Sequence, residues 1–334
     1  MTLWASADLG SNTFRLLVAE EVRPGALVLR ELRQKVVRLA EGLRPGGRLA
    51  PRAVARAEAL LRRFGARLDA LGVERRVGVL AAAGRAAADG PAFAQRAGAI
   101  LGGTVRIVSG VEEAALSARG AVGLAGPLPP RVLFVDIGGG STEVVAWAGG
   151  RPRAAVSLPV GVVGLWERVG ASDPPAREDR QRMAAACRAA WEALPGEILP
   201  PGWRHDLEAG LAALLATAGT PLTVAAMALG RSVGDTRALS GAVVGAGAVR
   251  RIADRLWSAT REERARWPSM EPGREDVILA GVALLEALLE RVGSPELRVS
   301  DGGLLEGVLL EAVEQERGTA GWADGGLGDA TESG

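Results

Sequence analysis

Two short segments of the sequence each place an aspartate, a glycine and small polar residues directly after an apolar stretch. The first is Asp8–Thr13 and the second is Asp136–Glu143. A turn of this composition presents several backbone N–H groups at one point, and Ser or Thr hydroxyls add further donors, so it can bind an anion such as phosphate. Glycine has no side chain, which lets the backbone approach a phosphate closely. The two segments therefore predict a pair of phosphate-binding turns.

The aspartates of the two turns, Asp8 and Asp136, suit a different ligand. A carboxylate repels a phosphate, but it binds Mg²⁺, which accepts carboxylates together with phosphate oxygens and water. The same residues also suit tight β-turns in which Asp and Gly serve only the backbone geometry. Because the pattern occurs twice, the sequence favours the magnesium and phosphate interpretation.

Glutamates close to these turns could act on water. Ser109 stands where it can cap a helix, so Glu112 and Glu113 would lie in the first helical turn, where the helix dipole favours them. One of the two could instead be a general base for water. Glu143, next to the second turn, is either an exposed or a catalytic carboxylate. Arg85 could bind a phosphate, since arginine forms bidentate pairs with such oxygens, although arginine is abundant in this chain.

The composition excludes several classes of protein and of site. Basic and acidic residues number 40 and 39, which argues against a strongly basic nucleic-acid-binding protein. The chain has one cysteine, Cys187, and one histidine, His205, so it cannot build a disulfide framework or a multi-His zinc site. Cys187 is predicted to lie within a helix and His205 in a loop, and we expect both to be bystanders.

The sequence carries no segment typical of a membrane protein. Residues 1–5 contain no basic region before an apolar run, and no stretch reaches about 18 uninterrupted apolar residues. We therefore expect no signal peptide, no membrane span and a cytoplasmic location.

The apolar patterns predict an α/β protein of two domains, as the length of 334 residues also suggests. Each candidate turn lies in a β-hairpin that opens one half of the chain, and helices and strands alternate after it, which is typical of a mixed sheet covered by helices. The proline-rich segment Gly126–Pro130 separates the halves. Because the hairpin occurs in both halves, duplication of one lobe is the simplest explanation.

These patterns also predict domain boundaries. We expect an N-terminal lobe over residues 1–125 and a C-terminal lobe over residues 126–317, with the final helix, within residues 303–317, packing back on the N-terminal lobe. Residues 318–334 are rich in Gly, Asp and Glu and are expected to be disordered. Among the individual elements, one long helix is predicted over Gly241–Trp257.

The sequence resembles the Ppx/GppA family of exopolyphosphatases and guanosine pentaphosphate phosphohydrolases from about Ala5 to about Ala312. The segments that carry the resemblance are Asp8–Phe14, Ser109–Ala114, Asp136–Glu143, Ser157–Val163, Pro272–Ile278 and Ser300–Gly307. That family belongs to the sugar kinase, Hsp70 and actin superfamily, so the resemblance implies two ribonuclease-H-like lobes around a central cleft. With its short length and single histidine, the chain resembles the form that lacks a C-terminal HD-type domain.

The resemblance also implies roles for particular residues. Glu113 would be the catalytic glutamate, and Glu143 would help to position or activate the attacking water. Asp136 would hold Mg²⁺, and Asp8 is the second candidate ligand of the metal. Arg85 would match a phosphate-binding arginine. The other phosphate contacts would come from Ser11, Asn12, Thr13, Gly138, Gly139, Gly140, Ser141 and Thr142.

Several positions depart from the family pattern. Ala81 and Ala82 stand where the family usually has Thr and Ser, and Gly164 and Leu305 stand where Arg is common. Ser240 replaces a histidine that many members have. The proposed carboxylates are all present, whereas the contacts at the edge of the phosphate site are fewer. We therefore expect substrate affinity or substrate choice to differ.

Together these features predict a Mg²⁺-dependent phosphohydrolase that releases the terminal phosphate of inorganic polyphosphate through glutamate-assisted attack by water. One alternative is a guanosine pentaphosphate 5′-phosphohydrolase. Others are a phosphotransferase of the same superfamily, with Ala218–Pro221 as its candidate adenosine site, and a non-catalytic sensor that binds polyphosphate or alarmone. No nucleic acid or membrane partner is expected, and a homodimer is left open as the assembly.

Overall fold

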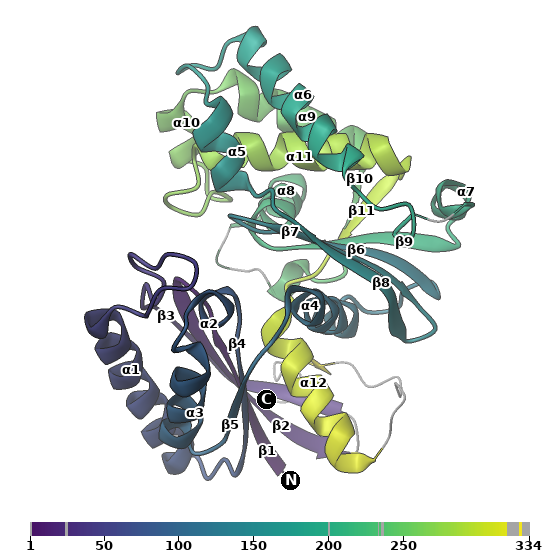
Figure 1. Ribbon diagram of the computed structural model, residues 1–334. Helices are drawn as coiled ribbons and strands as arrows, with labels where there is room; N and C mark the ends of the chain where they lie inside the picture. Colours follow the sequence, from purple (N-terminus) through teal and green to yellow (C-terminus); the bar gives the residue numbers. More distant parts are fainter. Residues whose placement is uncertain are drawn as a thin grey trace. The chain divides into compact units, whose positions relative to one another are not determined.

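The computed structural model describes residues 2–23, 26–199, 201–232, 234, 237–318 and 327–328 (Figure 1). The chain forms two compact units. The first combines Met1–Gly123 with Leu304–Gly334, and the second consists of Leu124–Gly303. Each unit is built on its own mixed sheet with helices, so the protein belongs to the predicted α/β class.

The sheet of the first unit has the strand order β12-β3-β2-β1-β4-β5. Strands β1, β2 and β3 form an antiparallel meander, and β4 and β5 run parallel to β1. The strands are β1 (Thr2–Leu9), β2 (Thr13–Arg23), β3 (Ala26–Val36), β4 (Arg75–Leu80), β5 (Thr104–Ile107) and β12 (Leu327–Gly328).

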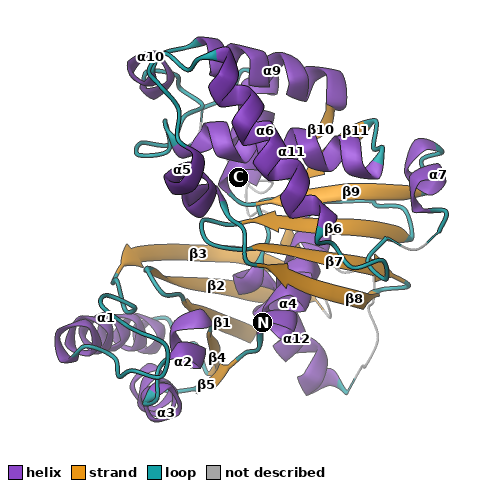
Figure 2. Ribbon diagram, turned by 45° about the horizontal axis from the view of Figure 1, so that its top comes forward, coloured by secondary structure: helices purple, strands orange, loops and turns teal. Residues whose placement is uncertain are grey.

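Helices cover both faces of this first sheet (Figure 2). They are α1 (Pro51–Ala70), α2 (Ala82–Ala86), α3 (Gly90–Leu101), α4 (Gly110–Leu124) and α12 (Leu304–Arg317). Because side chains alternate along a strand, β1 serves two cores. Ala5, Ala7 and Leu9 pack with α1 and α3, whereas Trp4 packs with α12. By the same alternation Asp8 lies on the face of Trp4, which α12 covers.

The sheet of the second unit has the order β10-β11-β9-β6-β7-β8. Here β6, β7 and β8 form the antiparallel meander, β9 and β11 run parallel to β6, and β10 is antiparallel to β11. The strands are β6 (Arg131–Ile137), β7 (Thr142–Ala148), β8 (Arg151–Leu158), β9 (Ala212–Thr217), β10 (Val243–Gly245) and β11 (Glu296–Val299).

One helix, α11 (Val277–Val292), lies at the centre of the helical layer of this second unit (Figure 1). It is apolar on nearly every side because α5, α6, α8 and α9 all pack around it. Although α11 is so apolar, no helix within the described ranges is long and apolar enough to cross a membrane. The other helical segments are α5 (Val162–Val169), α6 (Arg177–Glu192), α7 (Trp203–Glu208), α8 (Gly219–Leu229), η1 (Arg237–Leu239), α9 (Ala246–Ser258) and α10 (Arg261–Ala265).

The two sheets repeat one topology. The meander β1-β2-β3 corresponds to β6-β7-β8, and the parallel strands β4 and β5 correspond to β9 and β11. The register repeats as well, since Asp8 pairs with Arg15 across the first hairpin and Asp136 pairs with Glu143 across the second. An antiparallel meander flanked by parallel strands is the arrangement of ribonuclease-H-like folds, so the repeat seen in the sequence extends to the whole sheet.

Three sequence expectations differ from the structure. The helix predicted over Gly241–Trp257 begins only at Ala246, because Val243–Gly245 forms strand β10 at the edge of the sheet. His205 lies in the short helix α7 rather than in a loop. Within the tail that was expected to be disordered, Leu327–Gly328 pairs with β3. Residues 319–326 and 329–334 of that tail lie outside the described residues.

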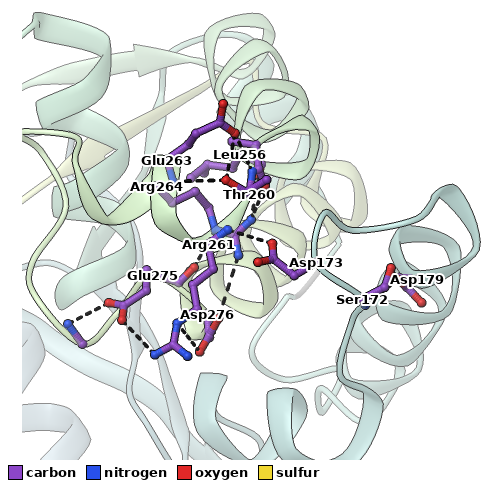
Figure 3. A network of polar contacts seen from close by, with 12 residues as sticks. Ser172, Asp173, Asp179, Leu256, Thr260, Arg261, Glu263, Arg264, Glu275 and Asp276 are labelled. Atoms are coloured by element: carbon purple, nitrogen blue, oxygen red, sulfur yellow. Dashed lines mark hydrogen bonds and ion pairs between the residues drawn. The ribbon is translucent and has the colours of Figure 1, made fainter.

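A buried arginine holds the connection between α10 and α11 (Figure 3). The side chain of Arg264 is 2% exposed, and its guanidinium donates to the backbone carbonyls of Glu275 at 2.6 Å and Ala259 at 2.5 Å. Burial lowers the pKa of Arg264, and the nearby carboxylates of Asp173 and Asp276 act in the opposite direction. Arg264 therefore donates the hydrogen bonds that these carbonyls, away from solvent, would otherwise lack.

We expect Arg264→Ala to destabilise the protein by about 3–5 kcal/mol, because it leaves buried carbonyls and nearby acids without their cation. The matched control is Arg266→Ala, since Arg266 is 70% exposed and pairs with Glu262 one helical turn earlier. Such a surface pair contributes about 0.5 kcal/mol or less. Urea unfolding of both variants measures the difference. Equal losses of stability would show that burial of the Arg264 network is irrelevant.

Candidate active site

The first of the two predicted phosphate-binding turns follows β1 and starts at a half-buried carboxylate. The pKa of Asp8 is raised to about 6, mainly by burial. Arg15, opposite it on β2, acts to lower this pKa, and the charges of Glu113 and Glu306 act to raise it. Gly10 is required by the turn itself, because a Cβ atom there would lie 2.8 Å from the carbonyl oxygen of Thr13. The first unit thus gathers three acidic groups around one turn.

The backbone of this turn is fixed by the chain that leaves β3. The carbonyl of Asn12 accepts hydrogen bonds from the N–H groups of Val37 and Arg38, both at 2.8 Å, and the carbonyl of Ser11 accepts one from Ala40 at 3.0 Å. The side chains of Ser11 and Asn12 remain partly or fully exposed. The predicted phosphate contacts of this turn are therefore held in place yet accessible.

The structure distinguishes the two adjacent glutamates of α4. Ser109 and Glu112 form a capping box, in which the N–H of Ser109 donates to the Glu112 carboxylate at 2.8 Å and the N–H of Glu112 donates to the Ser109 hydroxyl at 3.1 Å. This backbone hydrogen bond lowers the pKa of Glu112, and Arg106 adds an ion pair at 3.1 Å. The predicted helix cap is confirmed, and the Glu112 carboxylate takes part in it.

Glu113 points to a different set of groups. Its carboxylate accepts a hydrogen bond from Nη1 of Arg85 at 2.8 Å, and the same nitrogen donates to the carbonyl of Val108 at 2.8 Å. The side chains of Arg85 and Glu113 are 34% and 25% exposed, so a ligand can reach both. Guanidinium has five N–H donors in all, so Arg85 keeps donors for a phosphate. The structure thus brings Glu113, Arg85 and Asp8 together within the first unit.

The second turn carries a pair of carboxylates. Asp136 on β6 and Glu143 on β7 lie directly opposite each other in the antiparallel ladder, so their side chains share one face. The Ser157 hydroxyl on β8 donates to the Glu143 carboxylate at 2.7 Å and orients it. At the equivalent position of the first hairpin Asp8 faces an arginine. Like charges directly opposite each other are unfavourable, which suits a cation bound at this point.

The close approach of Gly161 to the second turn requires a glycine at that position. A Cβ atom on Gly161 would lie 2.4 Å from the carbonyl carbon and oxygen of Gly139. The N–H groups of Val162 and Val163 donate to the carbonyls of Gly138 and Gly139 at 3.0 and 2.9 Å. The start of α5 therefore fixes the backbone of this turn, whereas Gly139 and Gly140 themselves stay exposed.

We expect Gly161→Ala to lower kcat/KM about 10²-fold, because the new Cβ must displace the second turn by a distance that matters for catalysis. Gly164→Ala is the matched control, since Gly164 lies in α5, which begins directly after Gly161, and a Cβ there would meet no atom within 4 Å. Steady-state kinetics on both variants, with circular dichroism to verify folding, gives the comparison. Wild-type kinetics for Gly161→Ala would mean that this turn does not bind substrate.

Thr142 differs from the expectation that it contacts phosphate. Its side chain is fully buried, and its hydroxyl donates to the carbonyl of Val160 at 2.7 Å. A buried hydroxyl committed in this way cannot reach a phosphate. Ser141, the preceding residue, is half-buried, and its carbonyl accepts the N–H of Gly138 at 3.0 Å to close the turn.

The departures from the family pattern are explained in part by packing. Leu305 is buried in the apolar cluster of Trp4 and Leu309, and its carbonyl accepts the Ser6 hydroxyl at 2.8 Å. The Ser240 hydroxyl accepts the N–H of Asp301 at 2.8 Å. These residues now serve the fold. Nothing in the structure explains Ala82, which is exposed.

The sequence did not single out two further residues, one close to the first turn and one at the start of α8. Glu306 is 5% exposed in the first turn of α12, within electrostatic reach of Asp8. Arg274 lies against the start of α8, where a Cβ on Gly219 would be 1.3 Å from its Nη1 atom. Both belong to segments that carry the family resemblance, but their relevance depends on contacts between segments that are distant in the sequence.

The acidic groups fit a Mg²⁺ ion that takes only one or two of its ligands from the protein. Among the described residues, no three Asp, Glu, His or Cys side chains converge on a single point. Mg²⁺ is commonly bound by one or two carboxylates, with substrate phosphates and water completing its coordination. Asp136 provides one such carboxylate on the second sheet, with Glu143 directly opposite it on the same face.

Comparison with known proteins agrees with this arrangement. The sequence model of the Ppx/GppA phosphatase family matches residues 17–316. Exopolyphosphatase 2 of Mycobacterium tuberculosis is 34% identical over 324 residues, which cover 93% of this chain and 98% of the relative.

Solved structures of the family show the same fold. A crystal structure of the Aquifex aeolicus Ppx/GppA family member has a TM-score of 0.81 at 28% identity and covers 94% of this chain and 98% of that one. An exopolyphosphatase from Cytophaga hutchinsonii has a TM-score of 0.72 at 26% identity, with 94% and 98% covered. The repeated sheets and the sequence match together show that the chain belongs to the Ppx/GppA phosphatase family, as an exopolyphosphatase-like phosphoanhydride hydrolase.

Proposed function

We propose that the protein is a Mg²⁺-dependent phosphohydrolase that releases the terminal phosphate of inorganic polyphosphate through glutamate-assisted attack by water. The observation that carries the proposal is that two adjacent glutamates have different partners. The carboxylate of Glu112 accepts a hydrogen bond from the backbone in the helix cap. The carboxylate of Glu113 is 25% exposed and pairs with Arg85, close to Asp8. The name of the relative from Mycobacterium tuberculosis supports polyphosphate as the substrate.

In this proposal Glu113 accepts a proton from water as the water oxygen attacks the terminal phosphorus. The bond from that phosphorus to the bridging oxygen of the chain breaks, and the shortened chain leaves with the electron pair. Glu143, oriented by Ser157, assists in positioning the water. Proton transfer of this kind contributes about 10²–10⁴-fold to the rate.

Charge on the phosphoryl oxygens is the main problem in such a reaction, and positively polarised groups must offset it. Arg85 supplies a guanidinium, and the two glycine-containing turns supply N–H groups, with the hydroxyls of Ser11, Thr13 and Ser141 as further donors. Asp136 would hold Mg²⁺, with Asp8 as the second candidate. When bound, Mg²⁺ neutralises phosphate oxygens and orients them.

A phosphotransferase is disfavoured by the turn after β9. Ala218–Pro221 is the segment that could have formed an adenosine site, but the guanidinium of Arg274 occupies the space against Gly219. Arg274 is held there by an ion pair with Glu271 at 2.5 Å. A planar base stacked on Gly219 would have to displace it.

The test is phosphate release from three substrates. Purified protein is incubated with polyphosphate, with guanosine pentaphosphate, and with polyphosphate plus ADP, each with and without Mg²⁺. We expect orthophosphate from polyphosphate only with Mg²⁺ and without any need for ADP. ATP formation would indicate a phosphotransferase, faster turnover of guanosine pentaphosphate would reverse the substrate assignment, and tight binding without turnover would indicate a sensor.

A further inference from the structure

A long irregular segment connects β3 to α1. β3 ends at Val36 and α1 begins at Pro51, so residues 37–50 contain neither helix nor strand. Irregular connections longer than about 12 residues are uncommon in compact domains and are usually functional. This one has a defined backbone, with a turn closed by the hydrogen bond from the N–H of Gly47 to the carbonyl of Arg44 at 2.8 Å.

The segment is bonded to both sides of the candidate site in the first unit. At its start, the N–H groups of Val37 and Arg38 reach the carbonyl of Asn12 in the first turn. Further along, the N–H of Gly46 donates to the carbonyl of Ala86 at 2.9 Å, and the N–H of Ala88 donates to the carbonyl of Gly47 at 2.7 Å. Ala86 directly follows Arg85. The segment therefore runs from the phosphate turn to the element that carries the phosphate-binding arginine.

The side chains of this segment are strongly basic. Residues 38–52 contain four arginines, Arg38, Arg44, Arg48 and Arg52, and one acidic residue, Glu41. Glu41 pairs at 2.5 Å with Arg56 of α1 and so does not neutralise the four. All four are exposed, and Arg48, which is 81% exposed, has its nearest carboxylate, that of Asp89, at 3.8 Å.

Two of these arginines stand at positions where arginine is unfavourable for the stability of the fold. Arg38 has a φ of 54°, a left-handed conformation that costs a residue other than glycine free energy and that persists mainly at functional sites. Arg52 is the second residue of α1, where a positive charge opposes the helix dipole, and the first turn of α1 contains no acidic residue. Stability alone would favour Gly or Asn at the first position and Asp or Glu at the second.

We propose that Arg38, Arg44, Arg48 and Arg52 form a basic track that binds the internal phosphates of the substrate, beyond the terminal phosphate held at the turns. This inference rests on the proposed function and deepens it, because it specifies a polymeric polyanion rather than a compact nucleotide. A row of cations bound to a regularly charged chain releases its condensed counterions, so binding becomes stronger with chain length and weaker with salt.

The test compares a long with a short substrate. The track variant is Arg44→Ser/Arg48→Ser/Arg52→Ser, which leaves Arg38 and the turn unchanged. The matched control removes the same charge from three exposed arginines elsewhere, as Arg23→Ser/Arg63→Ser/Arg251→Ser. For each protein, kcat/KM is measured with Mg²⁺ on long-chain polyphosphate and on tripolyphosphate over a series of salt concentrations.

We expect the ratio of kcat/KM for the long over the short substrate to fall about tenfold or more in the track variant only. The slope of log kcat/KM against log salt for the long chain should decrease by about one per arginine removed. A ratio within twofold of the unmodified protein, or an equal fall in the control, overturns the track. If the unmodified protein hydrolyses neither substrate, the proposed function fails, and equilibrium binding of long-chain polyphosphate then tests the track by itself.

A second variant, Arg38→Gly, separates strain from binding. Glycine relieves the left-handed conformation, so the thermal midpoint should be equal to or above that of the unmodified protein. The KM for long-chain polyphosphate should nevertheless rise. A lower midpoint together with an unchanged KM would make Arg38 a structural residue and remove it from the track.

Discussion

Glu113→Gln should lower kcat about 10²–10⁴-fold while leaving the affinity for polyphosphate nearly unchanged. Glutamine keeps the size of the side chain and can still accept a hydrogen bond from Arg85, but it cannot take a proton from water. The measurement pairs steady-state phosphate release with equilibrium binding of polyphosphate to the same variant. A loss of binding in place of a loss of turnover would make Glu113 a residue that only positions Arg85.

The control for this prediction is the neighbouring substitution Glu112→Gln. It weakens the capping box with Ser109 and the ion pair with Arg106, so it should reduce thermal stability slightly. Its kcat should stay within a few fold of that of the unmodified protein. If Glu112→Gln abolished turnover and Glu113→Gln did not, the assignment of the two glutamates would have to be exchanged.

Asp136→Asn should abolish the stimulation of activity by Mg²⁺, because an amide is a poor substitute for a carboxylate as a ligand of this ion. The same substitution keeps the size of the side chain and removes a negative charge directly opposite Glu143, so we expect the protein to remain folded. Activity is titrated against Mg²⁺ concentration, and the thermal midpoint is measured without the metal. Loss of stimulation with unchanged stability separates a ligand defect from unfolding.

Asp254→Asn is the matched control for the metal experiment. Asp254 lies in the same unit, is 58% exposed, and pairs with Arg180 on the helical layer. Its Mg²⁺ titration should follow that of the unmodified protein. A normal Mg²⁺ response of Asp136→Asn would move the metal to other carboxylates, with Asp8 as the first to examine.

Sequence was sufficient to predict the parts of the fold that are encoded locally. The two hairpins were predictable because each combines apolar strands with a turn in which Asp is followed, after one aliphatic residue, by Gly. Their similarity predicted a repeated sheet, and the matching registers of Asp8 with Arg15 and Asp136 with Glu143 agree with that repeat. The α/β class and the family followed from these segments.

Elements whose conformation depends on distant partners were harder to predict. Val243–Gly245 directly precedes the helix α9, and it forms a strand in the structure by pairing antiparallel with β11. Leu327–Gly328 likewise pairs with β3, from the opposite end of the chain. Local propensity does not contain this information, since tertiary pairing overrides it.

The candidate site shows the same division. The turns and their glycines were visible in the sequence, and the family resemblance implied Glu113 as the catalytic glutamate. The residue pattern alone left Glu112 and Glu113 as alternatives, because adjacent residues point about 100° apart on a helix and either could face the site. In the structure the N–H of Ser109 donates to Glu112, whereas Glu113 pairs with Arg85. Glu306 lies beside Asp8 only because α12 packs on the face of β1 that Trp4 shares. That packing joins residues from opposite ends of the sequence.

Hydrolysis in H₂¹⁸O tests most directly whether water attacks the terminal phosphorus of polyphosphate. The protein is incubated with polyphosphate and Mg²⁺ in labelled water, and the released orthophosphate and the shortened chain are analysed by mass spectrometry. We expect one ¹⁸O atom in each orthophosphate released in a single hydrolytic event and none in the shortened chain. Label in the chain instead of the orthophosphate, or unlabelled orthophosphate, would contradict the mechanism.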